Sequence, residues 1–112
     1  MKRFFRLARA VAARGNDRRR YRLGAVGIRS DGAIVKSKNI PNMYPEPQAH
    51  AEARLCKKLD KGAIVYVVRI DAYGLLTLAR PCASCIRIMR HNDVKRVYYS
   101  INETEYGVIR LK

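Results

Sequence analysis

Residues 63–70 form a nearly continuous run of apolar and β-branched side chains, Ala-Ile-Val-Tyr-Val-Val-Arg-Ile. A strand of this composition can be buried on both faces, as the central strands of α/β sheets are. The run therefore predicts a sheet that helices cover on both sides. At 112 residues the chain has room for one such core, so we expect a single domain over 1–112.

Shorter strand-like runs lie before and after this segment. Two of them, 23–28 and 33–36, are separated by a turn that contains Asp31-Gly32, which is a strong signal for a β-hairpin. The last two, 94–100 and 106–111, are joined by too few residues for a crossover connection. We therefore expect these two strands to pair antiparallel.

Apolar residues at helical spacing predict three helices, at about 2–14, from His50 onward, and at about 82–90. The first helix is apolar on one side and basic on the others. Gly62 would end the second helix, whose buried side would carry Leu55 and Leu59. Helices that alternate with strands imply an α/β fold, a three-layer α-β-α sandwich with one mixed sheet of about five strands.

Two short motifs carry residues that could bind a metal ion, His50-Ala51-Glu52 and Pro81-Cys82-Ala83-Ser84-Cys85. One imidazole and two thiolates make a three-ligand set for tetrahedral Zn²⁺, and the fourth position remains for water, as in catalytic zinc sites. Glu52 lies near enough to the histidine to move protons without being an obvious ligand. The bound water would have a pKa of about 7 and could act as hydroxide.

Both motifs fall at predicted helix starts, which has consequences for geometry. Cys82 and Cys85, at i and i+3, share one face of a helix and could hold one ion. Pro81 suits a first-turn position, and the positive end of the helix stabilises the two thiolates. His50 and Glu52 can converge on the same site only from the very beginning of their helix. We therefore expect the two helix N-termini to face each other across the zinc.

His-x-Glu followed by Pro-Cys-x-x-Cys resembles the pattern of zinc-dependent cytidine and deoxycytidylate deaminases and of their relatives that act on nucleic acids. The resemblance covers about residues 22–100 and implies a cytidine-deaminase-like fold. It implies that His50, Cys82 and Cys85 bind Zn²⁺, and that Glu52 is the proton shuttle of a hydrolytic deamination. It also implies that Asn39 binds the substrate sugar and that the Ala51 backbone N–H meets the base carbonyl.

Features outside the motifs leave the substrate open between two branches of the family. The loop from Asn39 to His50 is similar to that of tRNA-adenosine deaminases, although Arg80 stands where those enzymes usually have an acidic residue. The closing hairpin is similar to free-nucleoside cytidine deaminases, which usually have cysteine at the position of His50. We expect a cytosine nucleoside or nucleotide as substrate, free or in single-stranded DNA or RNA, with adenine in RNA as the alternative.

The net charge of +15 is high for a domain of this size, and residues 1–22 contain nine Lys or Arg and one Asp. Such a concentration suits a polyanion, although a solvated basic face kept for solubility is the competing interpretation. Tyr98 and Tyr99 end a predicted strand, and one of them should face the edge of the site. The candidate contacts to nucleic acid are Lys2, Arg3, Arg6, Arg9, Arg18, Arg19 and Arg20.

Other functional classes fit the sequence less well. A thioredoxin-like dithiol would use Cys82 and Cys85 but gives no task to His50 and Glu52. A catalytically silent zinc module that binds nucleic acid through its basic face is the second hypothesis. No apolar run approaches the length of a membrane span, so we expect no membrane partner and a cytoplasmic protein. A small domain with exposed sheet edges is expected to form a homo-oligomer.

Overall fold

The computed structural model describes residues 2–13, 22–38, 55 and 58–111. These residues form one six-stranded sheet with the order β2-β1-β3-β5-β6, in which β4 also pairs with β3. Only β3 and β5 are parallel among the paired strands that the structure describes, so the sheet is mixed, as predicted. The strands are β1 (Arg22–Ile28), β2 (Ile34–Lys38), β3 (Ile64–Ile70), β4 (Leu76–Thr77), β5 (Arg96–Ser100) and β6 (Tyr106–Arg110).

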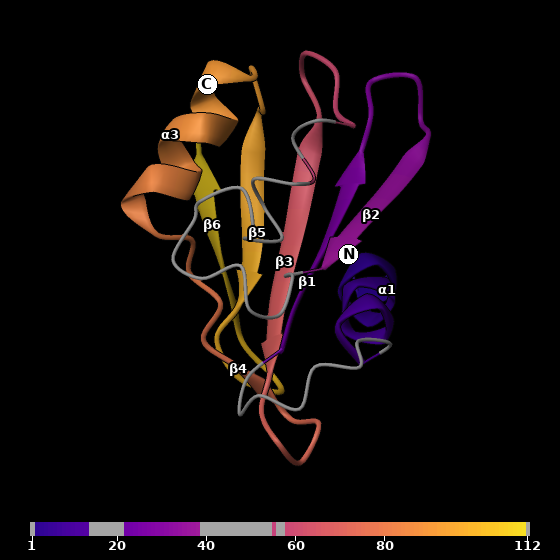
Figure 1. The fold of residues 1–112 in the computed structure, drawn as a ribbon, viewed down its shortest axis with the longest axis vertical. Helices are drawn as coiled ribbons and strands as arrows, with labels where there is room; N and C mark the ends of the chain where they lie inside the picture. The colour runs from indigo at the N-terminus through magenta and orange to yellow at the C-terminus, as the bar shows by residue number, and fades with distance from the viewer. Residues whose placement is uncertain (1, 14–21, 39–54, 56–57, 112) are drawn as a thin grey trace.

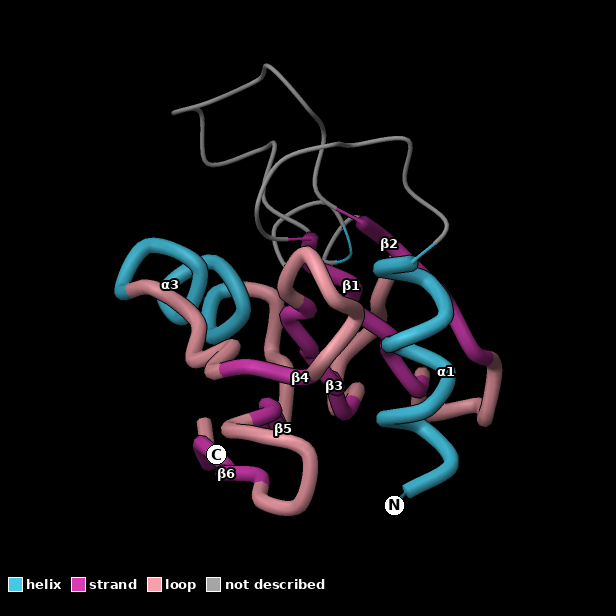
Figure 2. Tube along the Cα trace, turned by 90° about the horizontal axis from the view of Figure 1, so that it is seen from below, coloured by secondary structure: helices cyan, strands magenta, loops and turns pink. Residues whose placement is uncertain are grey.

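Two described helices, α1 (Lys2–Ala13) and α3 (Ala83–His91), lie on opposite sides of the sheet (Figures 1 and 2). The three-layer α-β-α arrangement predicted from the sequence is therefore confirmed. Both helices lie within a residue or two of their predicted bounds. The described part of the chain has no helix that is both long and apolar enough to cross a membrane.

β3 is the centre of both halves of the core. Its residues Val65 and Val67 belong to the apolar cluster that contains Cys85 and Met89 of α3. Val68, on the other face of the strand, belongs to a second cluster with residues of α1. All three valines are fully buried. The β-branched run thus forms a strand covered on both faces, as predicted.

The predicted hairpin joins β1 to β2 in antiparallel register, with Ile28 opposite Ile34. Gly32 has a φ of +90°, a conformation that favours glycine. The Asp31 carboxylate accepts a hydrogen bond from the backbone N–H of Ala33 at 3.0 Å, which closes the turn. The Asp31-Gly32 pair therefore forms the hairpin turn that the sequence predicted.

α1 lies directly against the backbone of β1 at Gly24. A Cβ at this position would be 2.4 Å from the carbonyl oxygen of Ala8 and 2.6 Å from the backbone nitrogen of Ala12. Ala8 and Ala12 are themselves buried. Three small residues therefore allow helix and strand to approach more closely than any side chain larger than hydrogen at Gly24 would permit.

The segment between β3 and α3 contains a short strand that sequence analysis did not identify. β4 has two residues, and Leu76 and Thr77 pair with Ile70 and Arg69 of β3. A strand of two residues is too short to show the alternation of apolar and polar residues by which strands are predicted. Asp71 positions it, because its carboxylate accepts hydrogen bonds from the backbone N–H groups of Tyr73 and Leu75 in the intervening turn.

Candidate active site at the start of α3

The N-terminus of α3 presents the cysteine motif. Cys82 is the N-cap residue, with extended φ and ψ of −71° and 166°, and the helix proper begins at Ala83. Pro81 therefore precedes the cap, and the expectation that it lies in the first turn is wrong. Its fixed φ instead suits the extended chain that enters the helix. The backbone N–H of Ile86 donates to the carbonyl oxygen of Cys82 at 3.0 Å, which starts the helical hydrogen bonds.

The two cysteines differ in their exposure to solvent. Cys82 is exposed, and its sulfur lies 3.2 Å from the hydroxyl oxygen of Ser84. Cys85 is fully buried within the apolar cluster on the α3 side of the sheet. As N-cap and third helical residue, they occupy the helix end where backbone N–H groups lack carbonyl partners. Two soft sulfur donors at this electropositive end are chemically suited to Zn²⁺.

The remaining ligand and the proton shuttle predicted from the sequence, His50 and Glu52, lie outside the described residues, as do Asn39 and Ala51. Within the described part of the chain, no group of three His, Cys, Asp or Glu side chains could hold a metal ion. The structure therefore brings together two of the three predicted ligands. The ligand set itself stays a prediction.

The chain that follows the first motif packs on the same face of the sheet as the second. Leu55 is fully buried in the cluster that contains Cys85, and Leu59 packs against this cluster. The backbone N–H of Lys58 donates to the carbonyl oxygen of Leu55 at 2.8 Å. The two leucines expected on the buried side of the second helix are thus directed into the core beside α3, but residues 58–62 are not helical, so the expectation that Leu59 belongs to that helix and that Gly62 ends it is wrong.

A cation lies beside the cysteine motif. Arg80 is exposed, and its guanidinium donates a hydrogen bond of 3.2 Å to the hydroxyl oxygen of Tyr99 on β5. The guanidinium carbon also lies 5.8 Å from the centre of the Tyr99 ring. Of the two tyrosines considered from the sequence, Tyr99 therefore faces the motif side, whereas Tyr98 stacks on Tyr66 on the opposite face. Sequence analysis noted Arg80 only as a departure from a pattern.

The end of β5 is tied to the chain that leads to Cys82. The backbone N–H of Ala79 donates to the carbonyl oxygen of Ser100 at 2.8 Å. The buried Ser100 hydroxyl donates in turn to the carbonyl oxygen of Thr77 at 2.7 Å. These bonds fix the segment before the motif against the carboxyl end of β5, so the motif stands at that end of the sheet.

The predicted basic contacts of α1 fall into two groups. Arg3 and Arg6 are exposed. Arg9 is engaged within the protein, because its guanidinium donates to the carbonyl oxygen of Gly74 at 2.7 Å and forms an ion pair of 3.2 Å with Glu103. The Lys2 side chain and the predicted contacts Arg18, Arg19 and Arg20 lie outside the described residues.

Comparisons with known proteins identify the family of the chain. The family described as the cytidine and deoxycytidylate deaminase zinc-binding region matches residues 1–101. A tRNA-specific adenosine deaminase of Rickettsia bellii (strain RML369-C) is 22% identical over 87 residues, which are 78% of this chain. The chain spans 60% of the length of that relative.

Solved structures show the same fold. A cytidine deaminase from Burkholderia pseudomallei superposes with a TM-score of 0.72 at 16% identity, covering 98% of this chain and 91% of that one. A cytidine deaminase from Mycobacterium leprae superposes with a TM-score of 0.66 at 18% identity, with 98% and 92% of the two chains covered. At these identities the likeness concerns the arrangement of the backbone.

Proposed function

The chain belongs to the cytidine and deoxycytidylate deaminase zinc-binding family, and on that premise we propose that it removes the amino group of a cytosine nucleotide by hydrolysis, which gives the uracil nucleotide and ammonia. The observation that carries the proposal is the cysteine pair at the electropositive start of α3, with Cys82 as N-cap and Cys85 one turn further on. Two thiolates at i and i+3 of a helix start can hold one metal ion, and the positive end of the helix stabilises them.

The residues have distinct tasks in this proposal. Cys82, Cys85 and His50 would hold Zn²⁺, which when bound makes a water molecule acidic enough to supply hydroxide near neutral pH. The Glu52 carboxylate accepts the proton of the attacking water. It then delivers this proton to the ring nitrogen next to the carbon that bears the amino group, and later assists the departure of ammonia. Asn39 binds the sugar, and the Ala51 N–H binds the base carbonyl.

Arg80 favours a substrate that carries phosphate. An exposed guanidinium held by Tyr99, two residues before Cys82, offers a charged donor beside the place where the base would bind. Arginine recognises phosphate oxygens with paired N–H donors. We therefore propose a nucleotide, or a nucleotide within a single strand, in preference to a free nucleoside. Arg80→Gln should raise the KM for dCMP about tenfold, as the loss of one charged hydrogen bond does, and leave that for cytidine nearly unchanged.

A second candidate is an adenosine deaminase that acts on RNA. The observation in its favour is the sequence similarity to the tRNA-specific adenosine deaminase of Rickettsia bellii. The two candidates share the zinc site and the proton shuttle. They differ in the base that the pocket accepts, so a direct product assay separates them.

The decisive assay incubates the zinc-loaded protein with cytidine, dCMP, a cytosine-containing oligonucleotide and an adenosine-containing RNA stem-loop. Uracil products from dCMP or the oligonucleotide are expected, and inosine alone would support the second candidate. Glu52→Ala is the matched control, because it should retain zinc and fold while turnover falls by about 10²-fold or more. Absence of any product from protein that contains one zinc per chain would indicate a silent zinc module.

Self-association is also part of the proposal. β2 and β6 are the edge strands of the described sheet, and unpaired edges are commonly covered by another chain. Light scattering at micromolar concentration should give the mass of a dimer or a larger assembly. A monomer mass would contradict this expectation.

A further inference from the structure

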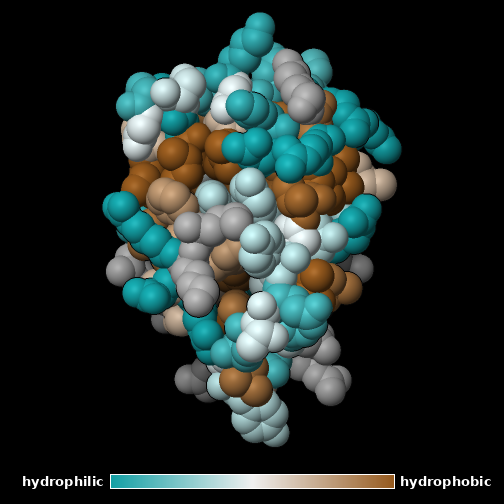
Figure 3. Space-filling model, turned by 180° about the vertical axis from the view of Figure 1, so that it is seen from behind, coloured by the Kyte–Doolittle hydropathy of each residue, from teal (hydrophilic) through white to brown (hydrophobic). Residues whose placement is uncertain are grey.

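The α1 side of β5 and β6 carries features that the deaminase site does not use. This is the face opposite α3, and α1 lies over β1 and β3 rather than over β6 (Figure 2). Every second residue of β6 is exposed, and the three exposed ones in its outward row are Tyr106, Val108 and Arg110. Hydrophilic and hydrophobic residues are interleaved across the rear face of the molecule (Figure 3).

Two arginines lie side by side at one end of this surface. Arg96 of β5 and Arg110 of β6 are direct cross-strand partners, so their side chains share one face. Neither forms an ion pair with any residue that the structure describes. Like charges placed directly opposite each other destabilise a pair of strands. An anion between the two guanidinium groups would remove this repulsion.

Arg96 is held in a fixed position beside Tyr98. Its Nε atom is buried and has no hydrogen-bond partner among the described residues. The rest of the guanidinium lies over the Tyr98 ring, with the guanidinium carbon 5.9 Å from its centre. The cation is therefore held in place by an aromatic ring while one donor stays unused.

Aromatic rings lead from this arginine pair to a cavity at the other end of the strands. The Tyr98 and Tyr106 ring centres are 6.1 Å apart, and those of Tyr106 and Phe5 are 5.5 Å apart. Tyr106 remains 49% exposed, which leaves part of its ring open to solvent. A ring that is fixed on one side and open on the other suits the stacking of a nucleobase.

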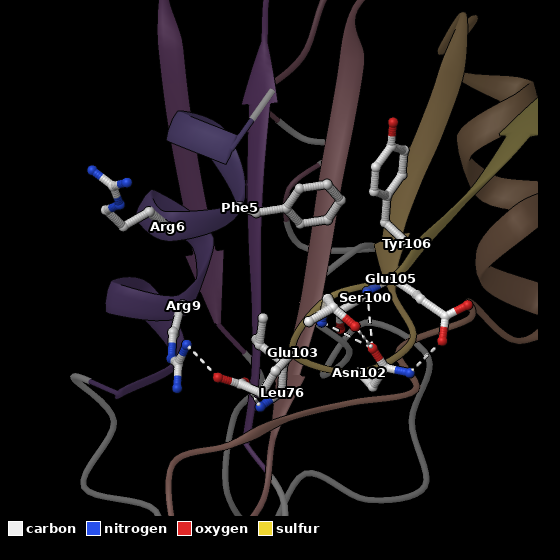
Figure 4. Close-up of a pocket in the computed structure, with 10 residues that line it drawn as sticks. Phe5, Arg6, Arg9, Leu76, Ser100, Asn102, Glu103, Glu105 and Tyr106 are labelled. Carbon is white, nitrogen blue, oxygen red and sulfur yellow. Dashed lines mark hydrogen bonds and ion pairs between the residues drawn. The ribbon is translucent and has the colours of Figure 1, made fainter.

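The cavity has a volume of about 440 Å³ and lies between α1 and the turn that joins β5 to β6. Phe5, Tyr106 and Arg6 are among the residues that line it, and the Arg6 side chain extends away from the two rings (Figure 4). Glu103 at its edge is paired with Arg9. Glu105 is exposed there and accepts a hydrogen bond from the Asn102 amide at 2.8 Å. This end of the surface is therefore suited to a base and not to phosphate, because a carboxylate can accept a hydrogen bond from an N–H group of the base and repels a phosphate.

We propose that this surface, formed by Tyr98, Tyr106, Arg96 and Arg110, binds single-stranded nucleic acid, with a base stacked on Tyr106 and a phosphate between the two arginines. Four residues of strand separate the two positions, or about 14 Å, so the surface spans a few nucleotides. The net charge of +15 favours a polyanion at this surface, where two arginines have no acidic partner among the described residues. A second copy of the chain would bring the same positive charge. Ser100 lines the cavity and also accepts the Ala79 hydrogen bond, so the cavity lies at the same sheet end as the cysteine motif.

The inference deepens the proposed function. It rests on that function only in taking the bound strand to be the substrate of the deaminase. Binding can be measured without any deamination, by the fluorescence anisotropy of a short fluorescein-labelled oligothymidylate. Thymine has no exocyclic amino group, so this probe is not a substrate for either candidate activity. Tyr106→Ala should weaken its binding about tenfold or more, and Tyr106→Phe should restore binding, because stacking needs the ring and not the hydroxyl.

The arginine pair is tested by the salt dependence of the same binding. The double variant Arg96→Gln/Arg110→Gln should weaken binding and reduce the slope of log affinity against log salt by about 0.7, the value for one phosphate contact on a single strand. Arg87→Gln/Arg90→Gln removes the same charge from exposed positions on α3 and should leave the slope unchanged. Arg110→Gln alone, at an exposed edge position, should lower the slope by half as much if the double variant folds poorly.

Three results would overturn the inference. Equal losses in the β5–β6 and α3 double variants would assign binding to net charge alone. Full binding by Tyr106→Ala would exclude stacking at this ring. A fall in molecular mass by light scattering on Tyr106→Ala would identify the surface as an interface between copies of the chain. Oligothymidylate binding that depends on Tyr106 in a protein that deaminates nothing would support the surface while refuting the proposed activity.

Discussion

The contact between α1 and β1 at Gly24 gives the most quantitative prediction. An alanine methyl group there would lie 2.4 Å from the Ala8 carbonyl oxygen and 2.6 Å from the Ala12 nitrogen, where ordinary contact begins at 3.4 Å. Both atoms belong to helix backbone, so no side-chain rotation can relieve the overlap. In Gly24→Ala the whole helix must therefore move away from the strand by about 1 Å, in line with the strain expected of an overpacked core.

The expected loss of stability follows from two opposing effects. Overpacking a well-packed contact costs about 1–3 kcal/mol. Replacing glycine by alanine restricts the unfolded chain and offsets about 0.4–1 kcal/mol of this. The net loss should be about 1–2 kcal/mol, which for a chain of 112 residues corresponds to a fall in Tm of roughly 4–9 °C.

Gly27→Ala is the matched control within the same strand. The new methyl group would meet the Leu59 side chain, at 2.4 Å from its terminal carbon, and this group can move by rotation. Urea or thermal unfolding followed by circular dichroism should therefore show a smaller loss for Gly27→Ala than for Gly24→Ala. A Gly24→Ala protein as stable as the wild type, or a larger loss of stability in Gly27→Ala, would refute the close contact between α1 and the backbone of β1.

Two further predictions concern the metal and the tyrosine cluster. Metal analysis should find one zinc per chain, and Cys82→Ala should lose zinc and with it stability, since metal binding is coupled to folding; protein purified without chelators that contains no zinc would overturn the ligand set. Burial and the nearby Tyr98 hydroxyl raise the pKa of Tyr66 above 10.0, an effect that Arg96 partly opposes. The folded state thus favours the neutral phenol, so this contribution to stability is complete below pH 10.0 and is lost as the pH rises through the raised pKa. Tyr66→Phe should therefore reduce the alkaline decline in urea-unfolding midpoint, and an unchanged decline would exclude Tyr66 as its source.

The parts of the fold that the sequence predicted are those in which local pattern and tertiary packing agree. The β-branched run of β3, the Asp31-Gly32 turn and the amphipathic α1 each carry their signal within a few residues. β4 was missed because two residues have no period, and its place depends on Asp71 and on pairing with β3. The close approach at Gly24 was missed because it depends on residues of α1 that are distant in sequence.

The candidate site divides in the same way. The cysteine motif was identified from residue types and spacing, and its position at a helix start is confirmed. That Cys82 is the cap and not a helical residue depends on the backbone conformation, which spacing does not encode. The hydrogen bond from Arg80 to Tyr99 could not be predicted from the sequence, because it joins residues from different elements. The sequence likewise predicted Arg9 as a nucleic-acid contact because of its charge. Its ion pair with Glu103 joins residues that are distant in sequence, so only the structure shows it.

The parallel pairing of β3 with β5 has a consequence for the order in which the protein assembles. The hairpins β1–β2 and β5–β6 close within a few residues, but Ile64 meets Arg96 only after the intervening α3 crossover has been placed. Contacts between residues that are distant in sequence form slowly, because a long loop must close first. Cys85 lies on this crossover and is buried in the folded protein, so a newly made chain should expose its thiol until a late stage of folding. Stopped-flow refolding with a thiol-reactive dye should therefore show Cys85 protected in the slowest phase.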